Sequence, residues 1–148
     1  MSKTLADDFN IRNFQFSEDY ASVIELWNHA GPGIHVRRSD APQEILKKLQ
    51  RDPDLFLIAE ADSQIIGTVM GGFDGRRGLV YHLAVKQSFR KLGIGRALMD
   101  ELEARLRNKG CIRCYLLVTK DNEDAIRFYE SSGWEIMDLH IFGKDLIP

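Results

Sequence analysis

The sequence predicts an α+β fold, in which a mixed but mainly antiparallel sheet is flanked by helices. Two periodicities predict it: short runs of alternating apolar and polar residues are typical of strands, and longer runs with apolar residues every three or four positions are typical of helices. The third observation is the predicted element order, β-α-α-β-β-β-α-β-α-β. Successive strands joined by turns favour antiparallel pairing, whereas helix–strand units favour parallel crossovers.

The first two predicted helices follow a short strand. Alternation over Asn10–Phe16 predicts the strand, and Ser17, a residue favoured at N-caps, predicts the start of the first helix. A Gly-Pro-Gly break at residues 31–33 separates this helix from a second one within residues 39–50, which Pro53 follows. The residues expected to face inward from the second helix are Ile45, Leu46 and Leu49.

The middle of the chain has the clearest periodicities. Residues 54–85 predict three strands, with turns at residues 61–64 and 74–78. The segment Ile94–Asn108 predicts an amphipathic helix that Gly110 ends. The apolar residues at its four-residue steps are Leu98, Leu102 and Leu106.

The last third predicts a strand over residues 111–119, a helix over residues 122–132 and an extended stretch over residues 134–147. Cys111 and Cys114 form a C-x-x-C pair inside that strand. A zinc site needs four ligands, and no second Cys/His pair with finger-like spacing is present. Residues three apart in a strand point to opposite faces, so structural cysteines and no metal are expected.

Length and charge exclude several classes of function. With 148 residues, the chain is expected to form a single domain over positions 1–148. A formal net charge of -2 does not favour nucleic acid or an anionic membrane as partner. The apolar runs are too short to span a bilayer, and the first ten residues lack the apolar core of a signal peptide. A cytoplasmic protein is expected.

The stretch "FRKLGIGRAL" places two glycines, Gly93 and Gly95, where the central helix begins. Helix N-termini carry unpaired N–H groups and a positive dipole end, and glycine lets an anion approach them closely. Arg90, Lys91 and Arg96 add positive charge. The stretch therefore predicts a phosphate or pyrophosphate site. A glycine-containing loop with solvated cations is an equally good interpretation of these residues alone.

Two common phosphate-binding loops are excluded. The P-loop requires G-x-x-x-x-G-K-[ST], which does not follow Gly93. The dinucleotide fingerprint requires a third glycine or alanine where this chain has Leu98. The expected ligand is therefore a different phosphate-bearing cofactor.

Two motifs resemble those of the GNAT superfamily of N-acetyltransferases. The residues R-K-L-G-I-G, Arg90–Gly95, fit its [Q/R]-x-x-G-x-[G/A] signature, and Asp121–Glu135 is similar to its second signature, N-x-x-A-x-x-x-Y-x-x-x-G-[FW]. The resemblance covers Leu79–Trp134, while the first 78 residues match only in element order. It implies a GNAT-type sheet in which the fourth and fifth strands, here Leu79–Val85 and Ile112–Thr119, splay apart.

The resemblance also implies acetyl-CoA as the cosubstrate and a set of binding residues. The backbone that would hold the pyrophosphate comprises Arg90, Lys91, Leu92, Gly93, Ile94, Gly95 and Arg96. Leu83, Ala84 and Val85 would pair with the pantetheine arm through main-chain groups, as an added strand does. Asn122 would form a hydrogen bond with the arm from the other side.

Tyr129 is the catalytic residue that the resemblance implies, placed near the sulfur of CoA. A phenol with an ordinary pKa of about 10 is protonated at neutral pH and can donate a proton to the leaving thiolate. Tyr129 also lies on one apolar stripe with Ala125, Ile126 and Phe128. A buried structural tyrosine is therefore the alternative.

The chain departs from the family pattern at the general base. Many relatives carry a glutamate on the fourth or fifth strand, where this chain has Leu79 and Leu117. The remaining candidates are Tyr81, His82, His35 and a water chain to bulk solvent. Alternation predicts that Tyr81 and His82 point to opposite faces, so that at most one of them faces the substrate.

The resemblance implies an amine acceptor but does not identify it. A small amine, an amino acid, a polyamine and a protein N-terminus remain open, and the missing glutamate favours acceptors with lower pKa values. The short tail after Trp134 leaves fewer residues to form the wall around the acceptor. The alternative function is a non-catalytic sensor or regulatory module that binds acyl-CoA. The oligomeric state, including a homodimer, is left open.

Overall fold

The structure, a computed structural model, describes residues 8–31 and 33–148. The prediction that the first ten residues form no signal peptide falls mostly on residues 1–7, which lie outside the described residues. The elements in chain order are β1 (Asn10–Asn13), α1 (Phe16–Asn28), η2 (Arg38–Asp40), α2 (Pro42–Arg51), β2 (Phe56–Ala61), β3 (Gln64–Phe73), β4 (Gly78–Val85), η3 (Gln87–Phe89), α3 (Ile94–Asn108), β5 (Cys114–Leu116) and α4 (Glu123–Ser131).

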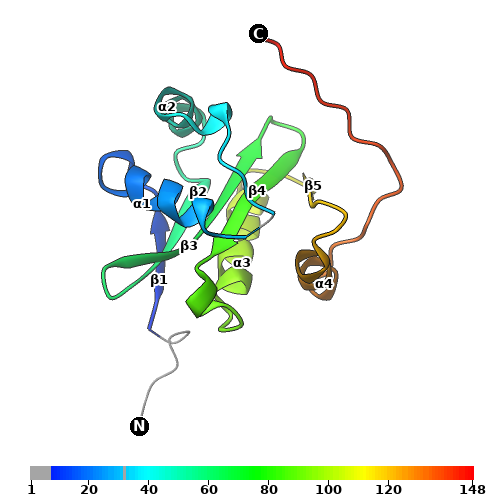
Figure 1. The fold of residues 1–148 in the computed structure, drawn as a ribbon. Coiled ribbons are helices and arrows are strands. Elements are labelled where there is room, and N and C mark those ends of the chain that lie inside the picture. Colours follow the sequence, from blue (N-terminus) through cyan, green and yellow to red (C-terminus); the bar gives the residue numbers. More distant parts are fainter. Residues whose placement is uncertain (1–7, 32) are drawn as a thin grey trace.

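One five-stranded sheet organises the molecule, with strand order β1-β2-β3-β4-β5. The first four strands pair antiparallel, and β4 pairs with β5 in parallel. Helices α1 and α2 lie on one face of the sheet and α3 lies on the other (Figure 1). The predicted mixed, mainly antiparallel sheet is therefore confirmed.

A separate apolar core fills each side of the sheet. On the α3 side, the predicted helix Ile94–Asn108 is confirmed, and its leucines Leu98, Leu102 and Leu106 are buried. A Cβ at Gly71 of β3 would lie 2.9 Å from Leu102 Cδ1, so this glycine lets α3 approach the sheet. On the other side, Trp27 and Phe14 pack against Phe56. Burial of each large apolar side chain contributes about 1.5–3 kcal/mol to the free energy of unfolding.

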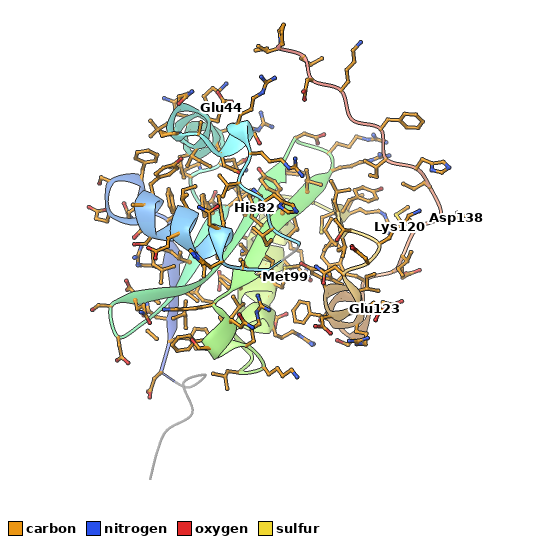
Figure 2. All side chains as sticks on the ribbon, in the orientation of Figure 1. Glu44, His82, Met99, Lys120, Glu123 and Asp138 are labelled. Atoms are coloured by element: carbon orange, nitrogen blue, oxygen red, sulfur yellow. The ribbon has the colours of Figure 1, made fainter. Side chains whose placement is uncertain are left out.

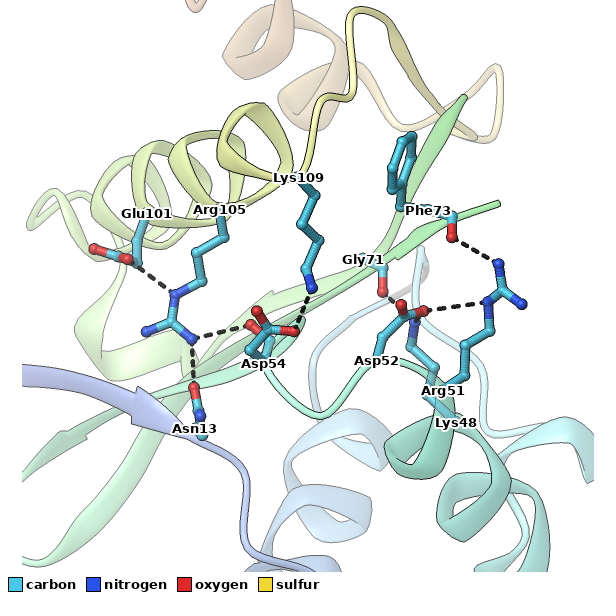
Figure 3. Close-up of polar contacts among 10 residues, drawn as sticks. All are labelled: Asn13, Lys48, Arg51, Asp52, Asp54, Gly71, Phe73, Glu101, Arg105 and Lys109. Atoms are coloured by element: carbon cyan, nitrogen blue, oxygen red, sulfur yellow. Dashed lines mark hydrogen bonds and ion pairs between the residues drawn. The ribbon is translucent and has the colours of Figure 1, made fainter. Parts of the chain in front are cut away.

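The polar side of α3 is tied to the edge of the sheet (Figure 3). Arg105 donates hydrogen bonds to the carbonyl of Asp54 at 3.0 Å and to the side chains of Glu101 and Asn13. The Lys109 ammonium lies 3.1 Å from the Asp54 carboxylate. These contacts fix the helix lengthwise on the sheet, and hence the position of its N-terminus.

Helix α1 begins one residue before the predicted N-cap, Ser17, which is therefore wrong as the cap. Gln15 occupies the N-cap position, and its N–H donates to the Asp19 carboxylate at 2.7 Å. Arg12 donates to the same carboxylate at 2.8 and 3.0 Å. Burial alone would raise the pKa of Asp19, but the hydrogen bonds from Arg12 and Gln15 outweigh it, so this pKa lies below its ordinary value.

The substitution Asp19→Asn is expected to lower the free energy of unfolding by about 2 kcal/mol at pH 7, because it removes charge-assisted bonds. A lowered carboxyl pKa stabilises the fold above the unfolded pKa of about 3.9 and loses this effect as the pH falls through the folded value. The difference between wild type and Asp19→Asn should therefore shrink as the pH falls below the unfolded pKa of about 3.9. Urea denaturation at pH 7 and below this pKa measures it, with the exposed Glu18→Gln as the control. An equal difference at both pH values would contradict the ionic explanation.

Helix α2 confirms the predicted stop before Pro53 but not all of the predicted inward face. Ile45 is buried, whereas Leu46 is 45% exposed. Neighbouring residues on a helix point about 100° apart, so the core side can accommodate only one of the two fully. Leu49 packs against the same core as Ile45.

The end of the chain differs most from the prediction. The predicted strand over residues 111–119 is reduced to Cys114–Leu116, and residues 134–147 form no strand. The apolar side chains of this tail are exposed, among them Ile136, Leu139, Ile141 and Phe142. The tail leaves α4 and runs along the outside of the molecule (Figure 1). Alternating apolar and polar residues form a strand only where a sheet or a core covers the apolar face of that strand.

The two cysteines of the C-x-x-C pair both lie beside Gly78 of β4. Cys111 precedes β5 instead of lying in it, and a Cβ at Gly78 would lie 2.9 Å from Cys111 Sγ and 3.0 Å from Cys114 Cβ. The prediction that the two cysteines point to opposite faces is therefore wrong. Burial and Cys111 raise the pKa of Cys114 to about 11, so this thiol stays protonated at neutral pH.

In the described part of the chain, no helix is long and apolar enough to cross a membrane.

Candidate active site

A bulge in β4 shapes the centre of the site. Between Thr68 and Met70, β3 advances two residues while β4 advances three, from Ala84 to Tyr81. His82 takes a left-handed conformation there, with φ of 53°. The extra residue bends the strand and redirects its side chains.

Beyond this bulge β4 separates from β5. The two strands pair only through Gly78–Val80 and Cys114–Leu116, and within the described residues Tyr81–Val85 has no strand on that side. The predicted splay of the fourth and fifth strands is thus present, with a shorter fifth strand than expected. Leu83, Ala84 and Val85 lie on this free edge, which an extended ligand can pair with as a strand does.

The glycine stretch forms the start of α3. Gly93 is the N-cap residue with φ of 86°, and Lys91 is also left-handed, with φ of 64°. No side chain caps the main-chain N–H groups at the start of α3, and a Cβ at Gly93 would meet no atom within 4 Å. Gly95 lies beneath Phe128, whose Cζ is 3.5 Å from the position of a Cβ. Successive N–H groups beside a left-handed residue form a concave anion site.

The other residues of the stretch divide between core and solvent. Ile94 is buried and Leu92 packs against the α3-side core, so their side chains anchor the loop. Lys91 and Arg96 are exposed, and Arg96 lies 3.7 Å from Asp100. The main chains of all four residues lie at the entrance of α3, the position that the family resemblance predicts for the pyrophosphate.

Arg90 has a role that its sequence context did not reveal. Its guanidinium donates to the carbonyl of Val85 at 3.2 Å and to the carbonyl of Ala30. The side chain therefore joins the end of α1 to the end of β4. This contact also occupies one main-chain acceptor at the end of the predicted pantetheine edge, so Arg90 contributes to this edge as a structural clamp.

Asn122 and Tyr129 bring α4 to the same opening. Asn122 is the N-cap of α4, and its Oδ1 accepts the N–H of Ala125 at 3.3 Å. Its Nδ2 lies 2.4 Å from the position of a Cβ at Gly33, so this residue contacts the segment that follows α1. Nδ2 remains a donor in its N-cap geometry.

Tyr129 packs against Phe128 and Trp134 with its ring edges, at centroid distances of 5.2 and 6.1 Å. Its hydroxyl makes no hydrogen bond to any residue that the structure describes. Burial raises the pKa of Tyr129 to about 12, so the hydroxyl stays protonated at neutral pH. An uncommitted phenol proton beside the splayed strands is suited to donation.

On the opposite side of the sheet, the bulge brings both candidate bases of β4 together. His82 contacts Trp27 of α1 and Asp40 of η2, and Tyr81 packs against the same core. The expectation that these two side chains point to opposite faces is therefore wrong, because the left-handed residue interrupts the alternation. Figure 2 shows His82 between β4 and the segment that connects α1 with α2.

Tyr81 borders a cavity of about 580 Å³ between α2 and the β3–β4 hairpin, whose lining includes Lys48, Asp52, Phe73 and Leu79. Lys48 lies 2.8 Å from the Asp52 carboxylate and also donates to the carbonyl of Gly71 (Figure 3). Burial, reinforced by Asp52 and Asp40, raises the pKa of Tyr81 to about 12. Tyr81 is thus a proton donor at neutral pH and not a base.

The other positions considered for the base offer little. Leu79 and Leu117 are exposed apolar residues, and His35 is exposed on the segment after α1. Asp40 was missed by sequence reasoning. In the sequence Ser-Asp-Ala-Pro it resembles a helix-capping residue, and nothing relates it to His82, 42 positions away.

Comparisons with known proteins agree with this arrangement. A model of the acetyltransferase (GNAT) family matches residues 20–134. Acetyltransferases of Pectobacterium atrosepticum and Yersinia enterocolitica are each 42% identical to the chain over 137 residues, which cover 93% of this chain and 95% of the relative.

Solved structures share the fold. The PaiA N-acetyltransferase from Thermoplasma acidophilum, in complex with coenzyme A, has a TM-score of 0.79 at 24% identity, covering 90% of this chain and 93% of that one. Ard1 from Thermoplasma volcanium has a TM-score of 0.77 at 26% identity, covering 88% and 84%. The family match, the two relatives and a sheet that opens beside the glycine loop show that the chain belongs to the acetyltransferase (GNAT) family, whose acetyl donor is acetyl-CoA.

Proposed function

We propose that the protein transfers the acetyl group of acetyl-CoA directly to a primary amine of a small molecule, an amino acid or a protein N-terminus. The observation that carries this proposal is the free edge of β4 together with the uncapped N-terminus of α3, around an apolar core against which Leu83, Val85 and Tyr129 all pack. An anion site, a strand edge and a proton donor are thus grouped around one core. This grouping suits a phosphate-bearing thioester.

The residues present fit the donor. The N–H groups from Arg90 to Arg96 would hold the pyrophosphate, since Gly93 leaves open space above them. Main-chain groups of Leu83, Ala84 and Val85 would pair with the pantetheine arm, and the Asn122 amide would donate to it. Acetyl-CoA supplies an activated acetyl group as a thioester. These assignments are supported by positions and free hydrogen-bonding groups.

Tyr129 would donate its Oη proton to the departing thiolate. Its raised pKa of about 12 keeps that proton in place at neutral pH. Because the thiol of CoA is more acidic than this phenol, Tyr129 stabilises the sulfur by sharing its proton as the C–S bond breaks, and reprotonation of the phenolate by solvent then drives the transfer to completion.

The acceptor must lose a proton before or during its attack. A lysine-like amine, with a pKa of about 10.4, lies about 3 pK units above neutral pH, which corresponds to about 4–5 kcal/mol. An α-amine near 8 requires only about 1–1.5 kcal/mol. Leu79 on β4 and Leu117 just after β5 are apolar where many relatives carry a glutamate, which favours an acceptor of the second kind.

The test is thiol release from acetyl-CoA against a library of amines, together with calorimetry using acetyl-CoA, CoA and NAD. We expect both CoA species to bind and NAD not to bind, and we expect thiol release to depend on a subset of amines. Binding without turnover by any amine would support the non-catalytic acyl-CoA sensor instead. No binding of either CoA species by folded protein would contradict both functions.

A further inference from the structure

The buried carboxylate of Asp40 orients the imidazole of His82. Asp40 is 3% exposed, and its Oδ1 and Oδ2 lie 3.0 and 3.2 Å from His82 Nε2. The N–H of Arg37 also donates to this carboxylate, at 3.0 Å. Burial alone would raise the pKa of Asp40, but the bonds from His82 and Arg37 outweigh it and leave the pKa below its ordinary value.

An ionised carboxylate accepts hydrogen bonds and donates none, so it fixes the tautomer of the ring. His82 Nε2 must carry the hydrogen that Asp40 accepts, and Nδ1 then keeps its lone pair. Across the described ranges 8–31 and 33–148, Nδ1 has no hydrogen-bond partner. The His82 side chain is 18% exposed, so this lone pair is reachable without being freely solvated.

The ring is also held in place from other directions. The indole of Trp27 lies against it, with ring centroids 4.4 Å apart. The Trp27 Nε1–H donates to Thr68 Oγ1 at 2.9 Å, and Thr68 Oγ1 donates to the main-chain carbonyl of His82 at 3.1 Å. Ring, carbonyl and carboxylate partner are thus fixed together, which is typical of a positioned group.

His82 stands where the two substrates of an acetyltransferase must meet. It immediately precedes Leu83–Val85, the free edge proposed for the pantetheine arm. Its ring centroid lies 5.8 Å from that of Tyr81, which lines the cavity beside α2. His82 therefore lies in sequence between the edge that suits a thioester and Tyr81, a residue that lines this cavity.

We infer that His82 is the general base of the reaction and that Asp40 is its positioning residue. This inference rests on the proposed function. The attacking amine nitrogen bonds to the thioester carbon and passes its proton to His82 Nδ1. The C–S bond then breaks with its electron pair on sulfur, which takes the Tyr129 proton. The products are the amide and CoA, and solvent removes the proton from His82 and restores that of Tyr129.

The titratable and charged groups around His82 and its neighbours Asp40 and Tyr81 come from four elements. Asp40 and Arg37 lie at η2, Tyr20 of α1 donates to the Asp40 carbonyl at 2.8 Å, and Tyr81 is its neighbour on β4. Lys48 of α2 stands over the Tyr81 ring, 5.9 Å from its centroid. Asp40 is the anion in direct contact with the imidazole, and the base therefore depends on it.

The test compares His82→Gln with wild type, using the best amine of the library. Glutamine can still donate to Asp40 but cannot take up a proton. We expect kcat to fall by about 100- to 10,000-fold at pH 7 with an unchanged Kd for acetyl-CoA, and the deficit to narrow as the pH approaches the pKa of the amine. His140→Gln, which changes an exposed histidine in the tail after α4, is the matched control and should retain wild-type kcat.

The substitution Asp40→Asn tests the positioning role through the tautomer of His82, which would not change if Asp40 were only structural. The asparagine amide can rotate and donate to Nε2, which shifts the hydrogen to Nδ1 and removes the lone pair. We expect nitrogen NMR to show the Nε2–H tautomer of His82 in wild type and the Nδ1–H tautomer in Asp40→Asn, with at least a tenfold loss of kcat.

Three outcomes would overturn the inference. One is a His82→Gln variant within threefold of wild-type kcat when chemistry limits turnover, which leaves the proposed function intact. Another is the Nδ1–H tautomer in wild type, a measurement that remains available if His82→Gln does not fold. The third is a wild type that binds acetyl-CoA but acetylates no amine, which overturns the proposed function as well.

Discussion

Tyr129→Phe is expected to lower kcat by about 100- to 10,000-fold, the range typical of a lost general acid, with an almost unchanged Kd for acetyl-CoA. The ring keeps its contacts with Phe128 and Trp134. The hydroxyl makes no hydrogen bond within the described part of the chain, so the free energy of unfolding should change by less than about 1 kcal/mol. Single-turnover kinetics beside melting curves measure both quantities.

The matched control is Tyr115→Phe on β5. The Tyr115 hydroxyl accepts a hydrogen bond from Arg113 at 3.3 Å and lies on the strand that pairs with the first part of β4. This variant should retain kcat. Because the pKa of Tyr129 is about 12, wild type should also show no loss of rate through Tyr129 ionisation below about pH 11. A Tyr129→Phe variant with near-normal kcat and a lowered Tm would instead identify a structural tyrosine.

Gly93→Asp is expected to weaken acetyl-CoA binding by roughly 30-fold while lowering the free energy of unfolding by no more than about 1 kcal/mol. The left-handed conformation of Gly93 strains any side chain, but aspartate tolerates it better than most residues and its capping of α3 offsets part of this cost. Its negative charge would oppose a pyrophosphate at the same N–H groups by about 2 kcal/mol near a protein surface. Calorimetry at low and high salt measures the difference.

Gly93→Asn separates charge from shape, because asparagine has nearly the same size and left-handed tolerance without the charge. We expect this variant to bind acetyl-CoA within about fivefold of wild type. Added salt should narrow the gap between the two variants, since it screens exposed charges. Equal losses of affinity in both variants, insensitive to salt, would mean that the backbone conformation, and not phosphate binding, is what the glycine serves.

The elements with strong periodicity were predictable, because their side chains face a core that the same segments build. The helix Ile94–Asn108 and the three strands before it agree with the structure. Prediction failed where a neighbour was needed. Asp19, and not Ser17, satisfies the start of α1 because Arg12 lies beside it, and the apolar tail after Trp134 has no face of the described structure to receive it.

The candidate site was predictable only in its local part. Gly93 and Gly95 at a helix entrance could be found because glycine conformation and helix starts depend on near neighbours, whereas Asn122 and Tyr129 were predicted from the resemblance to the family's second motif. The position of Arg90 between Ala30 and Val85 could not, because it depends on how α1 ends against β4. The roles proposed for these residues remain predictions for the experiments above.

By itself, the sequence determined the fold class, the glycine entrance to α3 and the family resemblance, since each depends on residues within one or two neighbouring elements. The tertiary structure alone decided which polar residues face one another. The bulge at His82 reverses the expected alternation, and it brings the ring to Asp40, 42 positions earlier, and to Trp27. A left-handed residue within a strand carries no reliable sequence signal, because the packing of α1 and η2 against the sheet is what stabilises it.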